Sequence, residues 1–453
     1  MHTRSRATAR MTSGVAAAAC VGLLAVAGCS SDSSSASSPS PSDAASSGPC
    51  GTTKPTTVTM GLFGTFGFKE NGLYNAYKKV CPNVTIKEDV VEQSADYWTR
   101  LKTRLASGSG LDDVQAIEIG FVADVVQNHA AQFVNFNDVS GAAKIKSEFY
   151  PWKWQQATSA DGKDTVGLGT DTGPEAICYR SDLLKKAGMS SDPADLAKQW
   201  TSWQDFIDFG KQYKAKTGQA FVDSAASIFS TAVYQGKEAY NNAEGQPDVE
   251  GSDGVQNAWS YATQAAQEGI TAGLSQFSDP WNKAFSSGAF AAIACPTWMM
   301  GYIQGQAGPA GAGKWSVAPV LPGGATNWGG SWLGVPTAAK NKPAAIALVT
   351  WLSAKNQQVT MWTSKAQGGH FPSNRLAAND PRVKNATSAY FSNAPVGKIF
   401  GAIAAEMKFP PIGLYDTQIQ NTLTTQLTNV ETKGTSPDQA FDDAMDQIAQ
   451  ITG

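Results

Sequence analysis

The chain has 453 residues, 42% hydrophobic and 16% charged, with 44 Gly and 22 Pro, a globular composition that excludes a disordered or collagen-like chain. A single hydrophobic core stops growing at roughly 250 to 300 residues, so this length predicts two lobes. With 35 basic and 38 acidic residues, the net charge of −3 offers no broad cationic surface, which argues against nucleic acid as a partner.

Residues 1–28 have the layout of a secretory signal peptide. Three arginines and no acidic residue precede an apolar run over residues 15–27, which is too short to anchor the mature chain by spanning a membrane. The run ends in Val26-Ala27-Gly28-Cys29, which resembles the bacterial lipobox and predicts Cys29 as the lipidated first residue. The alternative is a secreted protein with unmodified Cys29.

Residues 29–50 are predicted to be the lipidated cysteine and a linker, because positions 30 to 49 include eleven Ser and three Pro. Cleavage after residue 28 leaves 32 basic and 38 acidic residues, a net charge of −6. We therefore expect a flexible tether between lipid and folded domain, on the extracellular face of the cell membrane.

Three strands are predicted at residues 56–62, 84–87 and 114–119, with helices between them. Pro82 closes the first helix, and the second begins with Ser94 as its N-cap and stops at Gly108. One face of the first helix is expected to carry Leu73, Tyr74, Tyr77 and Val80. This β-α-β-α-β order predicts an α/β fold whose parallel sheet has a binding crevice at the carboxyl ends of its strands.

Further helices are predicted along the rest of the chain. Ser202 and Asp205 have the spacing of a capping box, which indicates a helix start. Helical periodicity also predicts segments at 255–267, 343–354, 416–430 and 437–448.

Four cysteines remain after Cys20 and Cys29 are set aside, and they allow three disulfide pairings. Cys50 and Cys81 precede the first two strands, whose starts lie side by side in a parallel sheet, so we expect these two to pair. Cys178 and Cys295 each lie in an apolar, strand-like run and could join neighbouring strands of the other lobe. None of the four has metal-ligand spacing, so no metal or cofactor is predicted.

Eight of the thirteen tryptophans form two groups of four. Four lie at helical spacing, where packing in the core is their ordinary role: Trp98, Trp203, Trp259 and Trp351. Four others lie beside Gly or Pro near predicted strand ends, where side chains can face a crevice: Trp281, Trp298, Trp328 and Trp332.

Flat indole rings suit the C–H faces of a pyranose, and carboxylates and amides suit its hydroxyl groups. Phe66, in the loop after the first strand, is a further aromatic candidate. The polar candidates are Glu118, Asp171, Gln93, Asn282 and His370. Each polar residue has the alternative role of a capping or solvated side chain.

Several motifs occur in an order that resembles one family. They are Ala176-Ile177-Cys178-Tyr179 with Arg180-Ser181-Asp182-Leu183-Leu184, Gly288-Ala289-Phe290-Ala291-Ala292 leading to Trp298, Trp315 to Pro319, Leu321 to Gly324, Gly329 to Val335, Gly368 to Ser373, and Pro410-Pro411. Over residues 55–451 the chain is similar to the extracellular solute-binding lipoproteins of carbohydrate-uptake ABC transporters, the maltodextrin-binding-protein-like family.

This resemblance implies a two-lobed periplasmic-binding-protein-like (type II) clamp with three hinge crossings. The expected lobes are residues 51–172 with 322–355, and 173–321 with 356–453. The family places a Trp at the position of Trp298 against sugar and a polar residue at that of Asp171 near the hinge. Tyr179-Arg180-Ser181 replaces the usual Tyr-Asn-Lys of the family, which leaves the hinge contacts open.

The implied function is that of a monomeric, non-enzymatic protein that captures an oligosaccharide and delivers it to the transmembrane subunits of an ABC permease. Within the family the chain looks most similar to actinobacterial cello-oligosaccharide binders, which favours cellobiose or cellotriose. Xylobiose is the alternative within the family. A secreted glycoside hydrolase, which would use two carboxylates, is the alternative of another class.

Overall fold

The computed structural model describes residues 48–364, 369–407 and 409–453. All of them belong to the second of the two units into which the chain divides, Met1–Asp43 and Ala44–Gly453. The predicted signal peptide, Cys29 and the linker up to residue 47 lie outside the described residues. None of the helices in the described part of the chain has the length and hydropathy of a membrane span.

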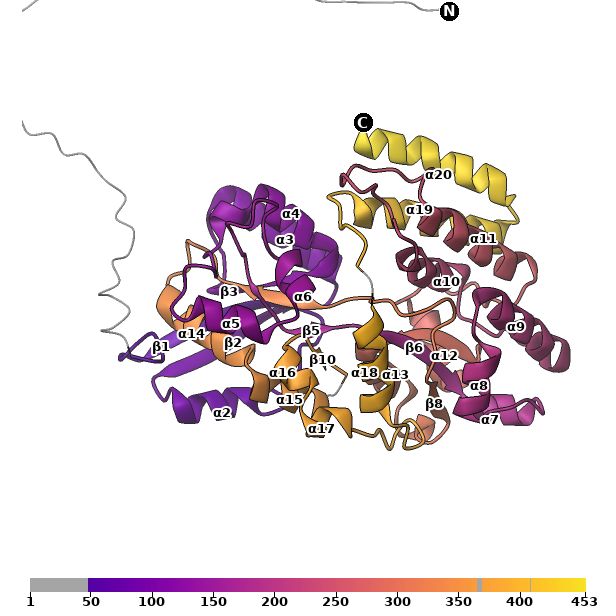
Figure 1. The fold of residues 1–453 in the computed structure, drawn as a ribbon, viewed down its shortest axis with the longest axis horizontal. Coiled ribbons are helices and arrows are strands. Elements are labelled where there is room, and N and C mark those ends of the chain that lie inside the picture. The colour runs from indigo at the N-terminus through magenta and orange to yellow at the C-terminus, as the bar shows by residue number, and fades with distance from the viewer. Residues whose placement is uncertain (1–47, 365–368, 408) are drawn as a thin grey trace, which may run out of the picture. The chain divides into compact units, whose positions relative to one another are not determined.

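A five-stranded sheet with the spatial order β2-β1-β3-β9-β4 forms the centre of what we call the first lobe (Figure 1). Its strands are β1 (Thr56–Phe63), β2 (Val84–Val91), β3 (Val114–Glu118), β4 (Leu168–Gly169) and β9 (Ser331–Gly334). β1 pairs in parallel with β2 and β3, which confirms the predicted parallel unit. β9 runs antiparallel to β3 and β4, so the complete sheet is mixed.

Helices cover both faces of this sheet. α2 and α14 contact each other on one face, and α3 and α4 lie across the other (Figure 1). This alternation follows from right-handed crossovers between parallel strands. The helices of the first lobe are α2 (Leu73–Val80), α3 (Ser94–Ser107), α4 (Ile119–Asn128), α5 (Ala142–Glu148), α6 (Pro151–Gln156) and α14 (Lys342–Leu352), with a 3₁₀ turn at Ala130–Gln132.

Two local predictions for these helices are wrong. Val80 is 58% exposed, because it is the last residue of α2 and extends past the buried stripe made by Leu73 and Tyr77. The N-cap of α3 is Gln93 instead of Ser94, and its side chain makes no capping hydrogen bond. The predicted stop is confirmed, since Gly108 adopts the left-handed conformation (φ 63°) that ends a helix.

The second lobe is built on an antiparallel sheet with the order β7-β6-β8. Its strands are β6 (Glu175–Arg180), β7 (Ala292–Pro296) and β8 (Trp315–Ala318), and every residue in them is buried. Side chains alternate between two cores: Ile177 and Tyr179 of β6 face one, and Ala176 and Cys178 face the other. A strand buried on both faces explains the uninterrupted apolar run in the sequence.

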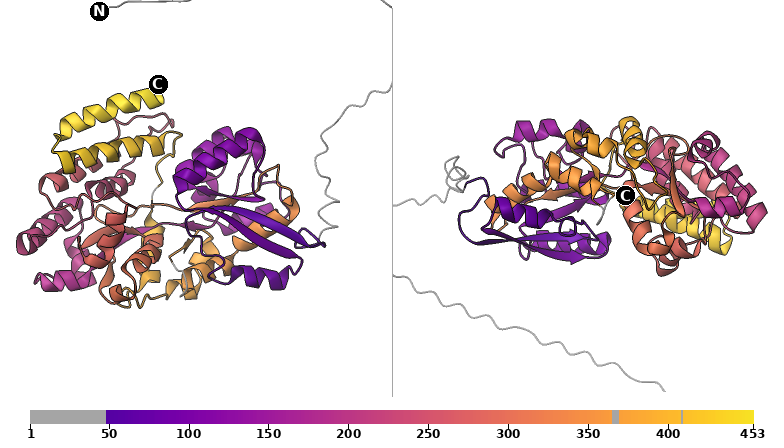
Figure 2. Two further views of the ribbon diagram at one scale, coloured as in Figure 1. Left: turned by 180° about the vertical axis from the view of Figure 1, so that it is seen from behind. Right: turned by 90° about the horizontal axis from the view of Figure 1, so that it is seen from below.

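One core of the second lobe lies under α7 (Ser181–Lys186), α8 (Pro193–Gln199), α9 (Trp203–Thr217), α10 (Ala225–Ala232), α11 (Asp253–Gln267), α19 (Asp416–Lys433) and α20 (Pro437–Thr452). The other lies under α12 (Asp279–Ser287), α13 (Thr297–Ala307), α16 (Arg375–Ala378), α17 (Pro381–Lys384) and α18 (Val396–Glu406). The predicted capping box of Ser202 and Asp205 opens α9. α19 and α20 pack side by side (Figure 1 and the left view of Figure 2).

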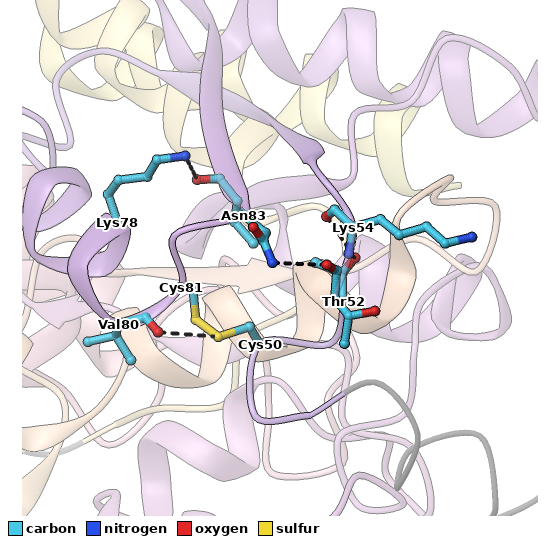
Figure 3. The surroundings of a disulfide bond; sticks show 9 residues. Cys50, Thr52, Lys54, Lys78, Val80, Cys81 and Asn83 are labelled. Atoms are coloured by element: carbon cyan, nitrogen blue, oxygen red, sulfur yellow. Dashed lines mark hydrogen bonds between the residues drawn. A yellow bond between two sulfur atoms is a disulfide. The ribbon is translucent and has the colours of Figure 1, made fainter.

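Both disulfides form as expected from strand order. Cys50 pairs with Cys81 (Figure 3), where the Asn83 side-chain amide also donates to the Thr53 carbonyl at 2.9 Å. Cys178 pairs with Cys295 across β6 and β7. Each bridge therefore links segments that the sheets already place side by side.

The chain passes between the two lobes three times in its described part, as the predicted clamp requires. The first crossing runs from β4 to β6 through β5 (Asp171–Thr172), and the second runs from β8 to β9. The third lies between α14 and β10 (Phe371–Pro372) and includes α15 (Lys355–Thr363), whose Met361 packs in the first lobe and Trp362 in the second. The lobe boundaries proposed from the sequence remain a prediction.

Candidate ligand-binding site

Three predicted site residues lie at the carboxyl edge of the first sheet. Phe66 follows β1, Gln93 follows β2, and Glu118 ends β3. The Gly64 amide donates to the Glu92 carbonyl at 3.1 Å, so the first two loops lie side by side. Gln93 is exposed, whereas Phe66 is 8% exposed. The sheet therefore gathers the first-lobe candidates at the predicted edge.

Glu118 has a structural role at this edge. It is the N-cap of α4, and its Oε2 accepts a hydrogen bond from the Gly120 amide at 2.8 Å. Burial raises the pKa of Glu118 to about 7, although the Gly120 amide and the Lys153 ammonium act in the opposite direction. The cap uses one carboxylate oxygen and holds the side chain opposite Ser331, its partner in the β3–β9 pairing.

Trp298 lies where all three crossing segments meet. A Cβ atom at Gly329 or Gly173 would lie 2.6 or 3.3 Å from the indole Nε1, and one at Gly369 would lie 3.3 Å from the Trp298 Cα. Gly329 and Gly369 also have φ values of 102° and 108°, a region that only glycine adopts readily. These glycines let the three backbones approach one tryptophan.

A cluster of partly open aromatic rings surrounds Trp298. Its Nε1–H donates to the Trp328 carbonyl at 2.8 Å, and the two rings meet edge to face with centroids 5.2 Å apart. The ring of Phe277 stacks against Trp298 at 6.3 Å with an interplanar angle of 20°. Trp298 and Trp328 are half-buried, and Phe277 is 40% exposed. The cluster thus presents apolar ring surface to solvent.

Phe277 was not among the residues predicted from the sequence. It has a φ of 64°, which is rare for a bulky residue, and it directly precedes Ser278, the N-cap of α12. An exposed ring held in an unfavourable backbone conformation is a feature that functional sites tolerate and that the core of a fold does not need. The only sequence signal was an aromatic residue just outside a helix cap.

Asp171 lies beside this cluster on the first crossing segment. Its Oδ1 accepts hydrogen bonds from the Ser331 amide (2.9 Å) and the Thr170 hydroxyl (2.8 Å), and its Oδ2 lies 3.8 Å from His370 Nδ1. Burial opposes ionisation, but His370, Lys153 and Thr170 together lower the pKa of Asp171 below its usual value. Two residues predicted separately, Asp171 and His370, are therefore brought together, and the carboxyl is held ionised.

Asn282 lies on the second-lobe side and accepts a hydrogen bond from the Tyr302 hydroxyl. Burial raises the pKa of Tyr302, and the negative charge of Glu92 raises it further. Glu92 precedes Gln93 in the first lobe, so the two lobes face each other within electrostatic reach here. Tyr302 also contacts Phe277, with ring centroids 5.8 Å apart.

Trp281 and Trp332 do not face a crevice, and that prediction is wrong. Trp281 is fully buried and its Nε1–H donates to Asp223 Oδ2 at 2.8 Å, because it lies on the same buried face of α12 as Ala284 and Phe285. Trp332 is 1% exposed in β9, and its Nε1–H donates to the Lys153 carbonyl at 3.2 Å. Trp281 belongs to a core of the second lobe and Trp332 to the core of the first.

Lys153 is a second residue that was not predicted from the sequence. It lies in α6, is 1% exposed, and places its Nζ 3.2 Å from the centroid of the Trp332 ring. Burial lowers the pKa of Lys153 to about 7, while Asp171 and Glu118 act to raise it. A buried lysine next to two carboxylates is a structural fact that periodicity does not reveal.

Two surface hollows, of about 580 and 330 Å³, contain none of the predicted site residues. The larger lies between α18 and the segment around Leu321, and the smaller lies over α9. In the described part of the chain, no group of three His, Cys, Asp or Glu side chains is arranged to hold a metal ion. We call the set Phe277, Trp298, Trp328, Asp171, His370 and Glu118 the crossing site.

Two α/β lobes, three crossing segments and a site where those segments meet define a protein of the two-lobed solute-binding class. Residues 72–390 match the family of bacterial extracellular solute-binding proteins, and the chain belongs to this family. Its members bind solutes and do not transform them, so the glycoside hydrolase alternative is not supported. The match to this family confirms the family that the sequence motifs predicted.

Individual relatives agree with this assignment. The lactose-binding protein of Rhizobium radiobacter is 26% identical over 369 residues, which are 78% of this chain and 83% of the relative. A crystal structure of an extracellular solute-binding protein of family 1 is 36% identical, with a TM-score of 0.78 over 88% of this chain and all of the other. The GacH receptor of Streptomyces glaucescens, solved with acarbose, is 20% identical, with a TM-score of 0.70 over 87% of this chain and 98% of the receptor.

Proposed function

We propose that this protein is the substrate-binding lipoprotein of an ABC sugar importer. It captures a short oligosaccharide, cellobiose or cellotriose in the first instance, and delivers it to the transmembrane subunits of the permease. Xylobiose is the alternative ligand. The protein acts as a monomer on the extracellular face of the cell membrane.

The observation that carries this proposal is the partly exposed aromatic cluster of Phe277, Trp298 and Trp328. Aromatic rings gain from covering the apolar C–H face of a pyranose, and here one ring is held by a strained backbone and another by three crossing segments. Asp171, ionised and with its Oδ2 3.8 Å from His370 Nδ1, is placed to accept sugar hydroxyl groups in charge-assisted hydrogen bonds.

The relatives support a carbohydrate ligand. One is named for lactose, and structures of the same fold were solved with β-1,6-galactobiose, maltose and acarbose. Lactose and cellobiose are both β-1,4-linked disaccharides that end in glucose, and they differ in the orientation of a single hydroxyl group. A site that distinguishes them does so through the contacts of that one hydroxyl group, so both sugars belong in any test.

Delivery follows from the arrangement of the lobes. Trp298, Phe277 and Asn282 belong to the second lobe, and Glu118 and Gln93 belong to the first. A sugar that contacts both sets favours the closed clamp only by the difference between its affinities for the closed and open states. The closed clamp is then the form that the permease recognises.

Calorimetric titration with cellobiose, cellotriose, lactose, xylobiose and maltose tests the proposal. We expect saturable binding of at least one β-1,4-linked sugar and no release of monosaccharide during prolonged incubation. Binding of none of the five sugars would contradict a sugar-importer role. Release of glucose from cellobiose would instead support the glycoside hydrolase hypothesis.

The lipid anchor has its own test. Cys29 is proposed to carry diacylglycerol, because it follows a charged segment, an apolar run and small residues in that order. We expect Cys29→Ala to move the protein from the membrane fraction to the culture medium in a bacterial host. Retention of the variant in the membrane fraction would contradict the anchor.

A further inference from the structure

Lys153 occupies a space that two backbone segments leave for it. A Cβ atom at Gly330, on the second crossing segment, would lie 2.8 Å from Lys153 Nζ. One at Gly169, at the end of β4, would lie 3.0 Å from its Cε. The lysine side chain therefore lies between Gly169, before the first crossing, and Gly330, on the second. A residue larger than glycine at either position would displace it.

The end of this side chain lies over the Trp332 ring and beside the backbone of the first crossing segment, since the same Cβ atom at Gly330 would also lie 2.9 Å from the Asp171 carbonyl oxygen. Its Nζ lies over Trp332 at 3.2 Å from the ring centroid, an arrangement in which the ring face attracts a cation. The negative charges of Glu118 in β3 and Asp171 in β5 both act to raise the pKa of Lys153. Asp171 Oδ2 in turn lies 3.8 Å from His370 Nδ1. No hydrogen bond from Nζ to another described residue accompanies these contacts.

We propose that Lys153 is a positioning residue for ligand binding, whose buried ammonium, held over Trp332 between Gly169 and Gly330, keeps Asp171 and Glu118 aligned at the crossing site. The inference rests on the proposed function, since it concerns affinity for a sugar. Lys153 itself is buried beneath the ligand-facing residues and acts through the two carboxylates.

The hydrogen bonds of the two carboxylates show why their charge matters. Asp171 Oδ1 holds the Ser331 amide and the Thr170 hydroxyl, which joins the first and second crossing segments. Glu118 Oε2 holds the first turn of α4. An ionised carboxylate accepts stronger hydrogen bonds than a protonated one, both from these groups and from a sugar. Without a nearby cation, burial favours the protonated form.

The pH dependence follows with a definite sign. Burial raises the pKa of Glu118 to about 7 and lowers that of Lys153 to about 7. Below this pH Glu118 takes up a proton, and above it Lys153 loses one, so the charged pair is most populated near pH 7. Sugar affinity is therefore expected to be highest near pH 7 and to fall on both sides.

The test compares three variants with the wild type from pH 5.5 to 8.5, using cellobiose or lactose, whichever the sugar panel shows to bind, as the probe. Lys153→Met retains the methylene packing and removes the charge, and Glu118→Gln removes the acid-side titration. Lys146→Met is the matched control, because Lys146 also lies over a tryptophan, with Nζ 5.9 Å from the Trp154 centroid, but is exposed.

We expect Lys153→Met to bind about tenfold more weakly at pH 7, to lose the fall in affinity above pH 7 and to move the acid-side fall to higher pH. Glu118→Gln should lose the acid-side fall, and Lys146→Met should match the wild type. If the wild type binds sugar and a folded Lys153→Met variant shows the same affinity and the same pH profile, the inference is overturned. Failure of the wild type to bind sugar would overturn the proposed function itself.

A measurement on the wild type alone covers a variant that does not fold. Among the described lysines, Lys153 is the one whose pKa is lowered. NMR of protein labelled with ¹³C at the lysine ε-carbons should show one resonance that titrates near pH 7. Titration of every lysine above pH 9 would overturn the inference without any variant.

Discussion

Replacing Phe277 by glycine is expected to separate ligand binding from folding. The change removes a ring that packs against Trp281, Trp298 and Tyr302 and also removes a side chain from a backbone with φ of 64°. The ring is 40% exposed, so it contributes only part of the ~1.5–3 kcal/mol of a fully buried phenylalanine, about 1–2 kcal/mol. The left-handed conformation costs a non-glycine residue about 1–2 kcal/mol.

These two contributions nearly cancel. We therefore expect the free energy of unfolding of Phe277→Gly to lie within about 1 kcal/mol of the wild type, a shift in Tm of roughly 2 °C or less. The loss of an aromatic contact with sugar should weaken binding about tenfold, or ~1.4 kcal/mol. Differential scanning calorimetry and titration with the bound sugar measure the two quantities. Wild-type affinity in the glycine variant would refute the assignment of Phe277 to the site.

Three further changes test the core and its charges. Trp281→Phe should lower the free energy of unfolding by about 2–4 kcal/mol in urea titrations, because it leaves Asp223 buried without its 2.8 Å donor. Its sugar affinity should equal that of the wild type. A loss of affinity with unchanged stability would instead place Trp281 in the site. Replacing both Cys178 and Cys295 by alanine should lower the free energy of unfolding by roughly 3–5 kcal/mol, since the bridge closes a loop with a sequence separation of 117. Equal stability of the oxidised wild type and the double variant would contradict the bridge. Burial raises the pKa of Glu175 from 4.5 to about 8, so the folded state holds a proton that the unfolded state releases, and wild-type stability should fall by roughly 2–4 kcal/mol between pH 5 and pH 8. The stability of Glu175→Gln in urea titrations should not fall over this pH range. The same pH dependence of stability in the variant and the wild type would contradict a buried, protonated Glu175.

Local patterns determine much of this fold, and for that reason they could be interpreted from the sequence. β1, β2 and β3 with their two helices, the capping box at Ser202 and both disulfides follow from periodicity, cap chemistry and strand adjacency. β9 could not be placed in this way. It joins the first sheet antiparallel to β3 from a distant part of the chain, and nothing local specifies its partner.

The site shows the same limit. Asp171, His370, Trp298 and Trp328 were selected as loop residues, and the structure brings them together. Trp281 was selected on the same grounds and is buried, because position in a sequence does not distinguish a ring that faces outward from one that enters the core. Phe277 and Lys153 were missed, since backbone strain and burial between two strands are properties of the folded chain alone.

The most direct test of the central claim is a crystal structure of the mature protein with the sugar that binds tightest in calorimetry. We expect one pyranose ring to lie against Trp298 and Phe277, with a hydroxyl group donating to Asp171. Sugar found in the hollow beside α18, with the crossing site occupied only by solvent, would contradict the account.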